Sequence, residues 1–175
     1  MRSIHPLKAP MIQSFNCILP HEPPVALILG SLPSVASLTE QQYYAHPHNA
    51  FWRIIEALFA DGQPLTYPQR IDVLKRQRIA LWDVIAHAER HGSLDSAIQA
   101  DTVIPNDIVG LLAAYPSITT IYLNGGAAAT LFKRHIAKQL SATVQVIPLP
   151  STSPANARIG FEVKLGRWGV IKDNV

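Results

Sequence analysis

The sequence predicts an α/β fold: a three-layer α/β/α sandwich in which a parallel sheet of four strands lies between helices. Short apolar runs alternate with segments of helical spacing, which is the pattern of βαβ units. The apolar runs are continuous rather than alternating, as in strands that are buried on both faces. The chain has 175 residues, which is enough for one domain with a substantial core.

The first 24 residues are rich in proline, which lacks a backbone N–H and is unfavourable in helices and central strands. We therefore predict an irregular arm over residues 1–24 and a single domain over residues 25–175. The first ten residues lack the apolar core of a signal peptide, and no apolar run approaches the roughly 20 residues that span a bilayer. We expect a cytoplasmic protein that acts as a monomer and has no membrane partner.

Four short apolar runs are the predicted strands, and each is followed by residues typical of turns. They cover residues 25–30, 79–84, 120–124 and 144–150.

Five segments with helical spacing are the predicted helices. In the first of them Trp52 and Ile55 share one face, and Asp61-Gly62 ends the helix. Asn106 is the predicted N-cap of the third. The five segments cover residues 51–60, 67–77, 107–115, 125–139 and 161–172, and residues 31–41 and 92–98 are predicted as loops.

The composition restricts the chemistry. Cys17 is the only cysteine, which excludes an intramolecular disulfide and a cysteine-based zinc site. Charged residues make up 15% of the chain, against about 25% in a typical protein. The net charge of +3 permits an anionic partner without requiring one.

Ligands of such sheets bind beyond the carboxyl ends of the strands. That rule selects residues 31–34, 82–83, 124–126 and 149–156. The stretch YYAHPHNAFW, Tyr43–Trp52, follows the first of these places and gathers aromatic rings, imidazoles and an amide in front of a helix. The sequence therefore predicts that this stretch, which we call the aromatic corner, belongs to a site.

Three motifs have a structural interpretation beside a functional one. The glycines of NGGAAA lack the spacing of a dinucleotide-binding loop, and close packing of a helix on the sheet explains them better. The H-x-H spacing of His46 and His48 is a weak signal of a metal site. A structural or substrate-contacting role explains His46 better. Asp83 is either a site residue or the N-cap of the next segment.

The stretch LPSTSPANAR, Leu149–Arg158, is dense in small hydroxyl side chains. It is either a plain surface loop or a phosphate-binding loop, because proteins hold phosphates with hydroxyls and exposed backbone N–H groups. Basic side chains at positions 133–135, 158, 164 and 167 could add a basic face around it.

Three stretches, in order, carry a specific resemblance. LILGSLPSVASLTEQQYYAHPHNAFWRI, IALWDVIAHAERHGSLDSAI and LPSTSPANA closely resemble the hypoxanthine-DNA glycosylases of the uracil-DNA glycosylase superfamily. The resemblance runs from about Val25 to the C-terminus and implies the same four-stranded sheet, with a uracil-DNA glycosylase-like fold. It also implies a repair enzyme that flips a deaminated base, hypoxanthine first, out of double-stranded DNA and hydrolyses its N-glycosidic bond.

Both usual catalytic groups of that superfamily are absent. Many members carry Asp or Asn where this chain has Ser31-Leu32-Pro33, and a histidine often stands at the place of Leu149. The resemblance to the hypoxanthine branch, which lacks both groups, makes Asn49 the candidate catalytic residue.

The resemblance also implies the binding residues. Tyr44 would stack on the extruded base, and Asp83 would contact its edge. Ser31 and His46 are further candidate substrate contacts. The candidate DNA-binding residues are Ser34, Ser151, Ser153, Asn156 and Arg158, with the residue that wedges into the duplex left open.

An amide suits this reaction because it donates and accepts hydrogen bonds but does not titrate. Bond cleavage builds negative charge on the leaving base, which fixed dipoles stabilise. We expect a monofunctional hydrolase with no metal and no cofactor, since no lysine lies in the motifs to form a Schiff base. Two alternatives stay open: a glycosylase for uracil or other deaminated bases, and a non-catalytic nucleic-acid-binding module.

Overall fold

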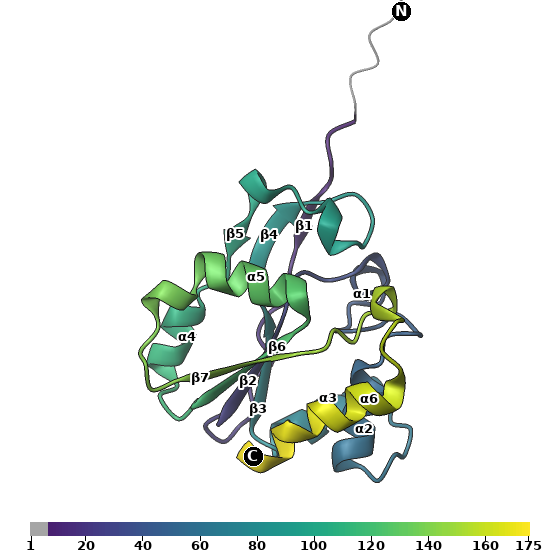
Figure 1. The fold of residues 1–175 in the computed structure, drawn as a ribbon, viewed down its shortest axis with the longest axis vertical. Helices are drawn as coiled ribbons and strands as arrows, with labels where there is room; N and C mark the ends of the chain where they lie inside the picture. The colour runs from purple at the N-terminus through teal and green to yellow at the C-terminus, as the bar shows by residue number, and fades with distance from the viewer. Residues whose placement is uncertain (1–6) are drawn as a thin grey trace, which may run out of the picture.

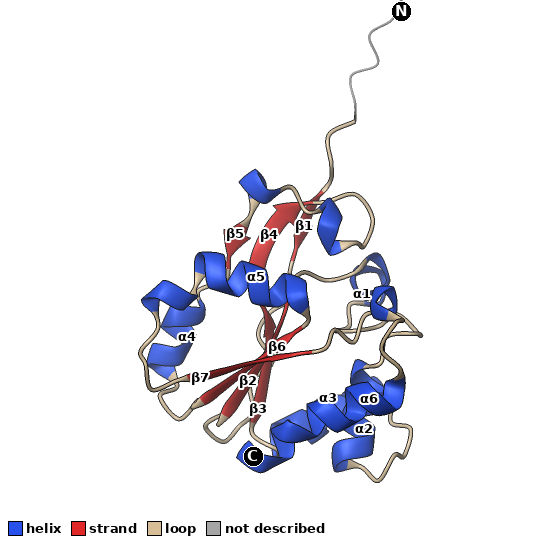
Figure 2. Cartoon of the chain, in the orientation of Figure 1, coloured by secondary structure: helices blue, strands red, loops and turns tan. Residues whose placement is uncertain are grey.

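The central sheet has four parallel strands in the order β3-β2-β6-β7 (Figures 1 and 2). The computed structural model describes residues 7–175. The strands are β2 (Ala26–Gly30), β3 (Ile79–Asp83), β6 (Thr120–Asn124) and β7 (Gln145–Leu149). Gly30 pairs with Asp83, and Asn124 pairs with Leu149, so the carboxyl ends of the strands meet at one edge. The predicted four-stranded parallel sheet is confirmed.

Helices cover both faces of this sheet, as predicted (Figure 1). The helices α2 (Phe51–Phe59), α3 (Tyr67–Arg76) and α6 (Phe161–Trp168) lie on one face, and α4 (Ile108–Ala114) and α5 (Gly126–His135) lie on the other.

Successive side chains of β2 pack alternately against the helical layers on the two faces of the sheet. Ala26 and Ile28 pack in the cluster that contains Phe51, whereas Leu27 and Leu29 pack in a second cluster on the opposite face of the sheet. Every β2 residue is buried, because a central parallel strand has helices on both sides.

A second, antiparallel sheet was not predicted. Its strands are β1 (Met11–Gln13), β4 (Ile85–Glu89) and β5 (Ile104–Pro105), in the order β1-β4-β5. Only Val84 separates β3 from β4, so the sequence pattern showed one strand where the structure has two. Strand β1 lies in the predicted irregular arm. It is an edge strand that pairs with β4, and an edge strand tolerates neighbouring prolines. Residues 1–6 of that arm lie outside the described residues.

Two local predictions were wrong. Residues 31–41, predicted as a loop, contain the helix α1 (Val35–Glu40), which begins at Ser34 because the Ser34 side chain accepts from the Ser37 N–H at 3.1 Å. The N-cap of α4 is Asp107, whose side chain accepts from the Gly110 N–H, and not Asn106. Asn106 Nδ2 instead donates to the backbone carbonyl of Asp83 at 2.8 Å.

Short 3-10 segments replace parts of the predicted loops and helices. They are η1 (Asp95–Ala97), η2 (Ala100–Thr102), η3 (Ala137–Gln139), η4 (Pro154–Asn156) and η5 (Gly169–Asn174). Segments η3 and η5 continue α5 and α6, where one longer helix was predicted in each case. Within residues 7–175, none of the helices is both long enough and apolar enough to cross a membrane.

Candidate active site

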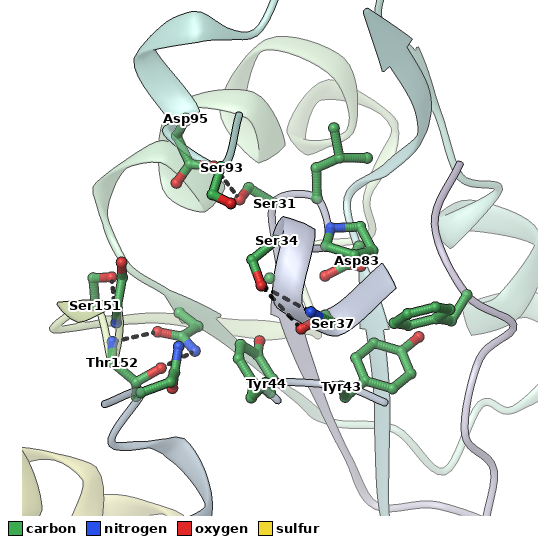
Figure 3. A pocket seen from close by; sticks show the side chains of 17 residues that line it. Ser31, Ser34, Ser37, Tyr43, Tyr44, Asp83, Ser93, Asp95, Ser151 and Thr152 are labelled. Atoms are coloured by element: carbon green, nitrogen blue, oxygen red, sulfur yellow. Dashed lines mark hydrogen bonds between the residues drawn. The ribbon is translucent and has the colours of Figure 1, made fainter. Parts of the chain in front are cut away.

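A cavity of about 90 Å³ opens at the carboxyl edge of the central sheet (Figure 3). Its walls come from the ends of β2, β3 and β6, from helix α1, from the aromatic corner and from the loop after β7. The loop that follows β4 adds Ser93 and Asp95. The cavity therefore lies where the topology of the sheet predicts a ligand.

Most of the predicted site residues line this one cavity. They are Ser31, Ser34, Tyr44, Asn49, Asp83, Ser151 and Ser153. His46, Asn156 and Arg158 are not among the lining residues. The His46 ring accepts from the His48 N–H at 3.1 Å, Asn156 lines a neighbouring hollow, and Arg158 is exposed on the surface.

The aromatic corner holds Tyr44 in an unusual conformation. Its φ of 53° lies in the left-handed region, which is costly for a bulky residue and is often found at functional sites. Phe51 stacks on the Tyr44 ring, with the centroids 4.1 Å apart. Trp52 Nε1 donates to the Tyr43 carbonyl at 2.7 Å. The surrounding contacts therefore hold the Tyr44 ring at the cavity.

Two polar side-chain atoms lie close to the backbone of Gly30, at the end of β2. A Cβ at this position would lie 2.7 Å from the Tyr44 hydroxyl and 2.6 Å from Asp83 Oδ1, so no other residue fits there without a shift. The buried Tyr44 hydroxyl has no hydrogen-bond partner within residues 7–175. Burial is the main cause that raises the pKa of Tyr44, and Asp83 raises it further. The nearby Asn124 side chain lowers this pKa by less, so the phenol stays neutral.

The side-chain amide of Asn49 makes a hydrogen bond through its oxygen, while its nitrogen makes none in the described residues. Its Oδ1 accepts from the Phe51 N–H at 2.9 Å and so satisfies one of the N–H groups that the first turn of α2 leaves open. Its Nδ2 donates to no side chain or carbonyl in the described part of the chain. Because Asn49 lines the cavity, a free donor is available there.

Asp83 is buried in the cavity wall with an unpaired oxygen. Its side chain is 4% exposed, and Oδ2 has no hydrogen-bond partner in the described residues. Burial is the main cause that raises the pKa of Asp83 to about 7; Asp95 raises this pKa further and Arg90 lowers it. Strand β4 begins two residues later, so the interpretation of Asp83 as a helix N-cap was wrong.

The loop after β4 contributes residues that the sequence analysis missed. The Ser31 hydroxyl donates to Asp95 Oδ1 at 2.7 Å (Figure 3). Arg90 is fully buried; its Nε donates to the Gly92 carbonyl, and its Nη2 donates to the Pro33 carbonyl. Arg90 thus fixes the loops on both sides of the cavity. The only sequence signal was Asp95 itself, a carboxylate in a segment predicted as a plain loop.

A pair of hydrogen bonds links the ends of β6 and β7. Asn124 Nδ2 donates to Thr152 Oγ1, and the Thr152 N–H donates to Asn124 Oδ1, both at 3.0 Å. The Thr152 carbonyl accepts from the Ala50 N–H at 2.9 Å. The aromatic corner is therefore tied to both strand ends, through two residues that were not named as candidates.

The first glycine of NGGAAA, Gly125, has a clear structural reason. It has a φ of 95°, and a Cβ there would lie 2.7 Å from Ser151 Cβ in the loop after β7. A Cβ on Gly126 would meet nothing within 4 Å. The positive φ and the close approach of two loops are thus the reasons for Gly125, and the predicted packing of a helix on the sheet does not explain this pair.

The loop after β7 is preformed by its own side chains. Ser151 Oγ accepts from the Ser153 N–H, and Ser153 Oγ accepts from the Ala155 N–H, both at 3.2 Å. Asn156 Nδ2 donates to the Ser151 carbonyl at 3.1 Å. The hydroxyl hydrogens of Ser151 and Ser153 make no hydrogen bond in the described residues, so they can still donate to a phosphate.

Within residues 7–175, no three His, Cys, Asp or Glu side chains gather as a metal site requires.

Comparisons with known proteins identify the family of this chain. The family model of the uracil DNA glycosylase superfamily matches residues 20–168. The chain is 39% identical to a hypoxanthine DNA glycosylase of Methanosarcina acetivorans over 75% of this chain and 80% of the relative. A second relative of that name, from Methanosarcina barkeri, is 38% identical over 57% of this chain and 62% of its own length.

The fold is also shared with a solved structure. A candidate uracil DNA glycosylase of Methanosarcina acetivorans, solved by solution NMR, superimposes with a TM-score of 0.74 and 32% identity. The match covers 93% of this chain and 99% of that one. This chain therefore belongs to the uracil DNA glycosylase superfamily.

Proposed function

We propose that this protein is a monofunctional DNA glycosylase that removes a deaminated base, with hypoxanthine as its first substrate, and leaves an abasic site. The two relatives named as hypoxanthine DNA glycosylases support this substrate. The observation that carries the proposal is the buried, unpaired carboxyl of Asp83, which lies beside Tyr44 in a cavity at the carboxyl edge of the sheet. All residues that line the cavity belong to one chain: Phe15 comes from the N-terminal arm, and the others come from residues 25–175. A monomer is therefore sufficient to form the site.

The target base must leave the duplex to reach this cavity. Flipping costs a few kcal/mol, and less at a mismatched or damaged pair. Stacking of the base on the Tyr44 ring returns roughly 1–3 kcal/mol. Phe51 supports the ring from one side, and on this proposal the base stacks on the opposite side.

Asp83 suits the edge of a deaminated base. Hypoxanthine presents an N–H donor next to a C=O acceptor, and a neutral carboxyl can accept from the first and donate to the second. Since the pKa of Asp83 is about 7, a large part of the protein carries the neutral form at neutral pH. Uracil has the same pair of groups, which keeps uracil as the second candidate substrate.

Asn49 supplies the polar contact for bond cleavage. The leaving base gains negative charge as the bond breaks, and an oriented N–H donor stabilises this charge in a site with little water. Asn49 Oδ1 is held by the start of α2, so its Nδ2 is fixed in direction before the substrate arrives. The attacking water is held near the sugar by proximity rather than by a strong base.

The function is tested with duplexes that carry one deoxyinosine, deoxyuridine or deoxyxanthosine. Hydrolysis without a Schiff base leaves an intact backbone, so strand breaks should appear only after alkali. We expect the largest yield with deoxyinosine. A protein that binds these duplexes but yields no alkali-sensitive site with any of them would be a non-catalytic binding module.

Chelators should not affect the reaction. The proposed chemistry uses an amide, a carboxyl and an aromatic ring, none of which needs a metal ion. Excision of hypoxanthine should therefore proceed at the same rate with and without EDTA. Loss of activity in EDTA with recovery in zinc would instead favour the His46 and His48 metal pair.

Tyr44 should act through its ring face rather than its hydroxyl. Tyr44→Ala removes roughly 1–3 kcal/mol of stacking, so binding of the damaged duplex should weaken by about fivefold to a hundredfold. Tyr44→Phe keeps the ring and removes a hydroxyl that has no partner, so its binding should match that of the wild type. Titrations of a deoxyinosine duplex with both variants measure this, and equal losses would assign the role to the hydroxyl.

A further inference from the structure

A second hollow lies beside the cavity, and we call it the basic groove. The aromatic corner, helix α2, the loop after β7 and helix α6 form its walls. The lining residues are His48, Ala50, Arg53, Pro154, Ala157, Ile159, Gly160, Phe161 and Lys164. Three of its lining side chains are basic, and none is acidic. Helix α6 begins here at Gly160, which offers no side-chain cap, so the positive end of the helix adds to the basic character.

Lys164 is the unusual residue of the basic groove. Its side chain is only 5% exposed, yet it makes no hydrogen bond or ion pair with residues 7–175. Burial lowers the pKa of Lys164. The residue is thus mostly covered, while its ammonium lines the groove without a partner in the described residues. An anion in the groove would compensate this charge.

Arg53 reinforces the same feature. Its guanidinium lies 4.1 Å from the centre of the Phe161 ring, a cation–π contact that directs the side chain along the groove. Arg53 pairs with no carboxylate in the described residues, so its N–H groups are free to donate. Arg53 and Lys164 thus offer two free cations within one hollow.

We infer that the basic groove binds a backbone phosphate of the DNA strand that carries the flipped nucleotide. The inference rests on the proposed function. Asn49 lies between His48 and Ala50 in the sequence, and Pro154 follows Ser153 directly, so the groove and the cavity share the same two loops. A strand that places its base over Asn49 and its phosphate on the serine loop would continue into this groove.

The test is the salt dependence of binding to an undamaged, fluorescein-labelled duplex, which needs no catalysis. Each neutralised phosphate contributes about 0.9 to the slope of log Kd against log salt. Lys164→Met keeps the length and apolar stem of the side chain, whereas Arg53→Gln changes an exposed residue. Because the groove holds one phosphate, each variant is expected to reduce the slope by up to about 0.9 and to weaken binding by about tenfold in low salt.

Lys138→Met is the matched control, because it removes the same charge from η3, outside the groove. Its slope should equal that of the wild type, and melting curves should show all variants folded. Slopes of Lys164→Met and Arg53→Gln that equal the control would overturn the groove as a phosphate site. If the wild type still excised hypoxanthine, only this inference would fail. A wild type that bound no duplex would overturn the inference together with the proposed function.

Discussion

Replacing Asn49 with alanine is expected to lower the single-turnover rate of hypoxanthine excision by about a hundredfold or more. Loss of one preorganised donor of this kind typically costs on the order of 3–4 kcal/mol of transition-state stabilisation. Because the donor matters mainly as charge develops, the affinity for the damaged duplex should stay close to that of the wild type. Cleavage at saturating enzyme, beside a binding titration, separates the two quantities.

The variant Asn49→Asp separates catalysis from folding. Asn49 also holds the start of α2 through the Phe51 N–H, and loss of such a contact costs about 1 kcal/mol of stability. Asp keeps this acceptor and suits a helix N-terminus, but its carboxylate has no N–H to donate. We expect Asn49→Asp to melt like the wild type and to excise as slowly as Asn49→Ala. A folded Asn49→Ala with a wild-type rate would remove Asn49 from the mechanism and leave Asp83 as the next candidate.

The second large effect is expected at Asp83. The neutral carboxyl is the form that can donate to the base. Excision should therefore reach a plateau well below the pKa of about 7 and should fall as the pH rises through that value. Asp83→Ala should lower excision by roughly fivefold to a hundredfold, since a bidentate contact to a base edge is worth about 1–3 kcal/mol. Asp83→Asn offers the same donor and acceptor without titrating, so it should retain activity and lose the alkaline decline.

The same carboxyl should make stability depend on pH. Its folded-state pKa of about 7 lies above the ordinary value of about 3.9, so the folded protein binds the proton more tightly. This contribution is complete below about pH 4 and is lost as the pH rises through about 7. Asp83→Asn should therefore raise the melting temperature more at pH 8 than at pH 5. An equal change at both pH values, with an unchanged pH profile of excision, would show that Asp83 does not titrate in this range.

Local patterns predicted the central sheet because its strands are buried on both faces and are separated by clear helical segments. The second sheet was missed for a physical reason. Strand β4 follows β3 after one residue and lies against short edge strands, so it lacks both the turn signal and the continuous apolar run. Helix α1 was missed because it has only six residues, too few for a helical period to stand out.

The candidate site was predicted best where motifs are continuous in the sequence. Tyr44, Asn49 and Asp83 were placed by the quoted motifs and by the rule for strand ends, and all three line the cavity. Arg90, Asp95 and Thr152 act through contacts with distant segments, such as the bond from Ser31 to Asp95. Nothing in their neighbouring residues signals these partners. His46 was expected at the substrate, but its ring is used within its own turn.

The base that leaves the DNA is the most direct evidence for the central claim. A duplex with one deoxyinosine is incubated with excess wild-type protein, and the small molecules released are identified and counted by mass spectrometry. We expect free hypoxanthine in an amount equal to the abasic sites formed, with far less from Asn49→Asp in the same time. A wild-type protein that binds the duplex but releases neither hypoxanthine, uracil nor xanthine from the matching substrates would contradict the account.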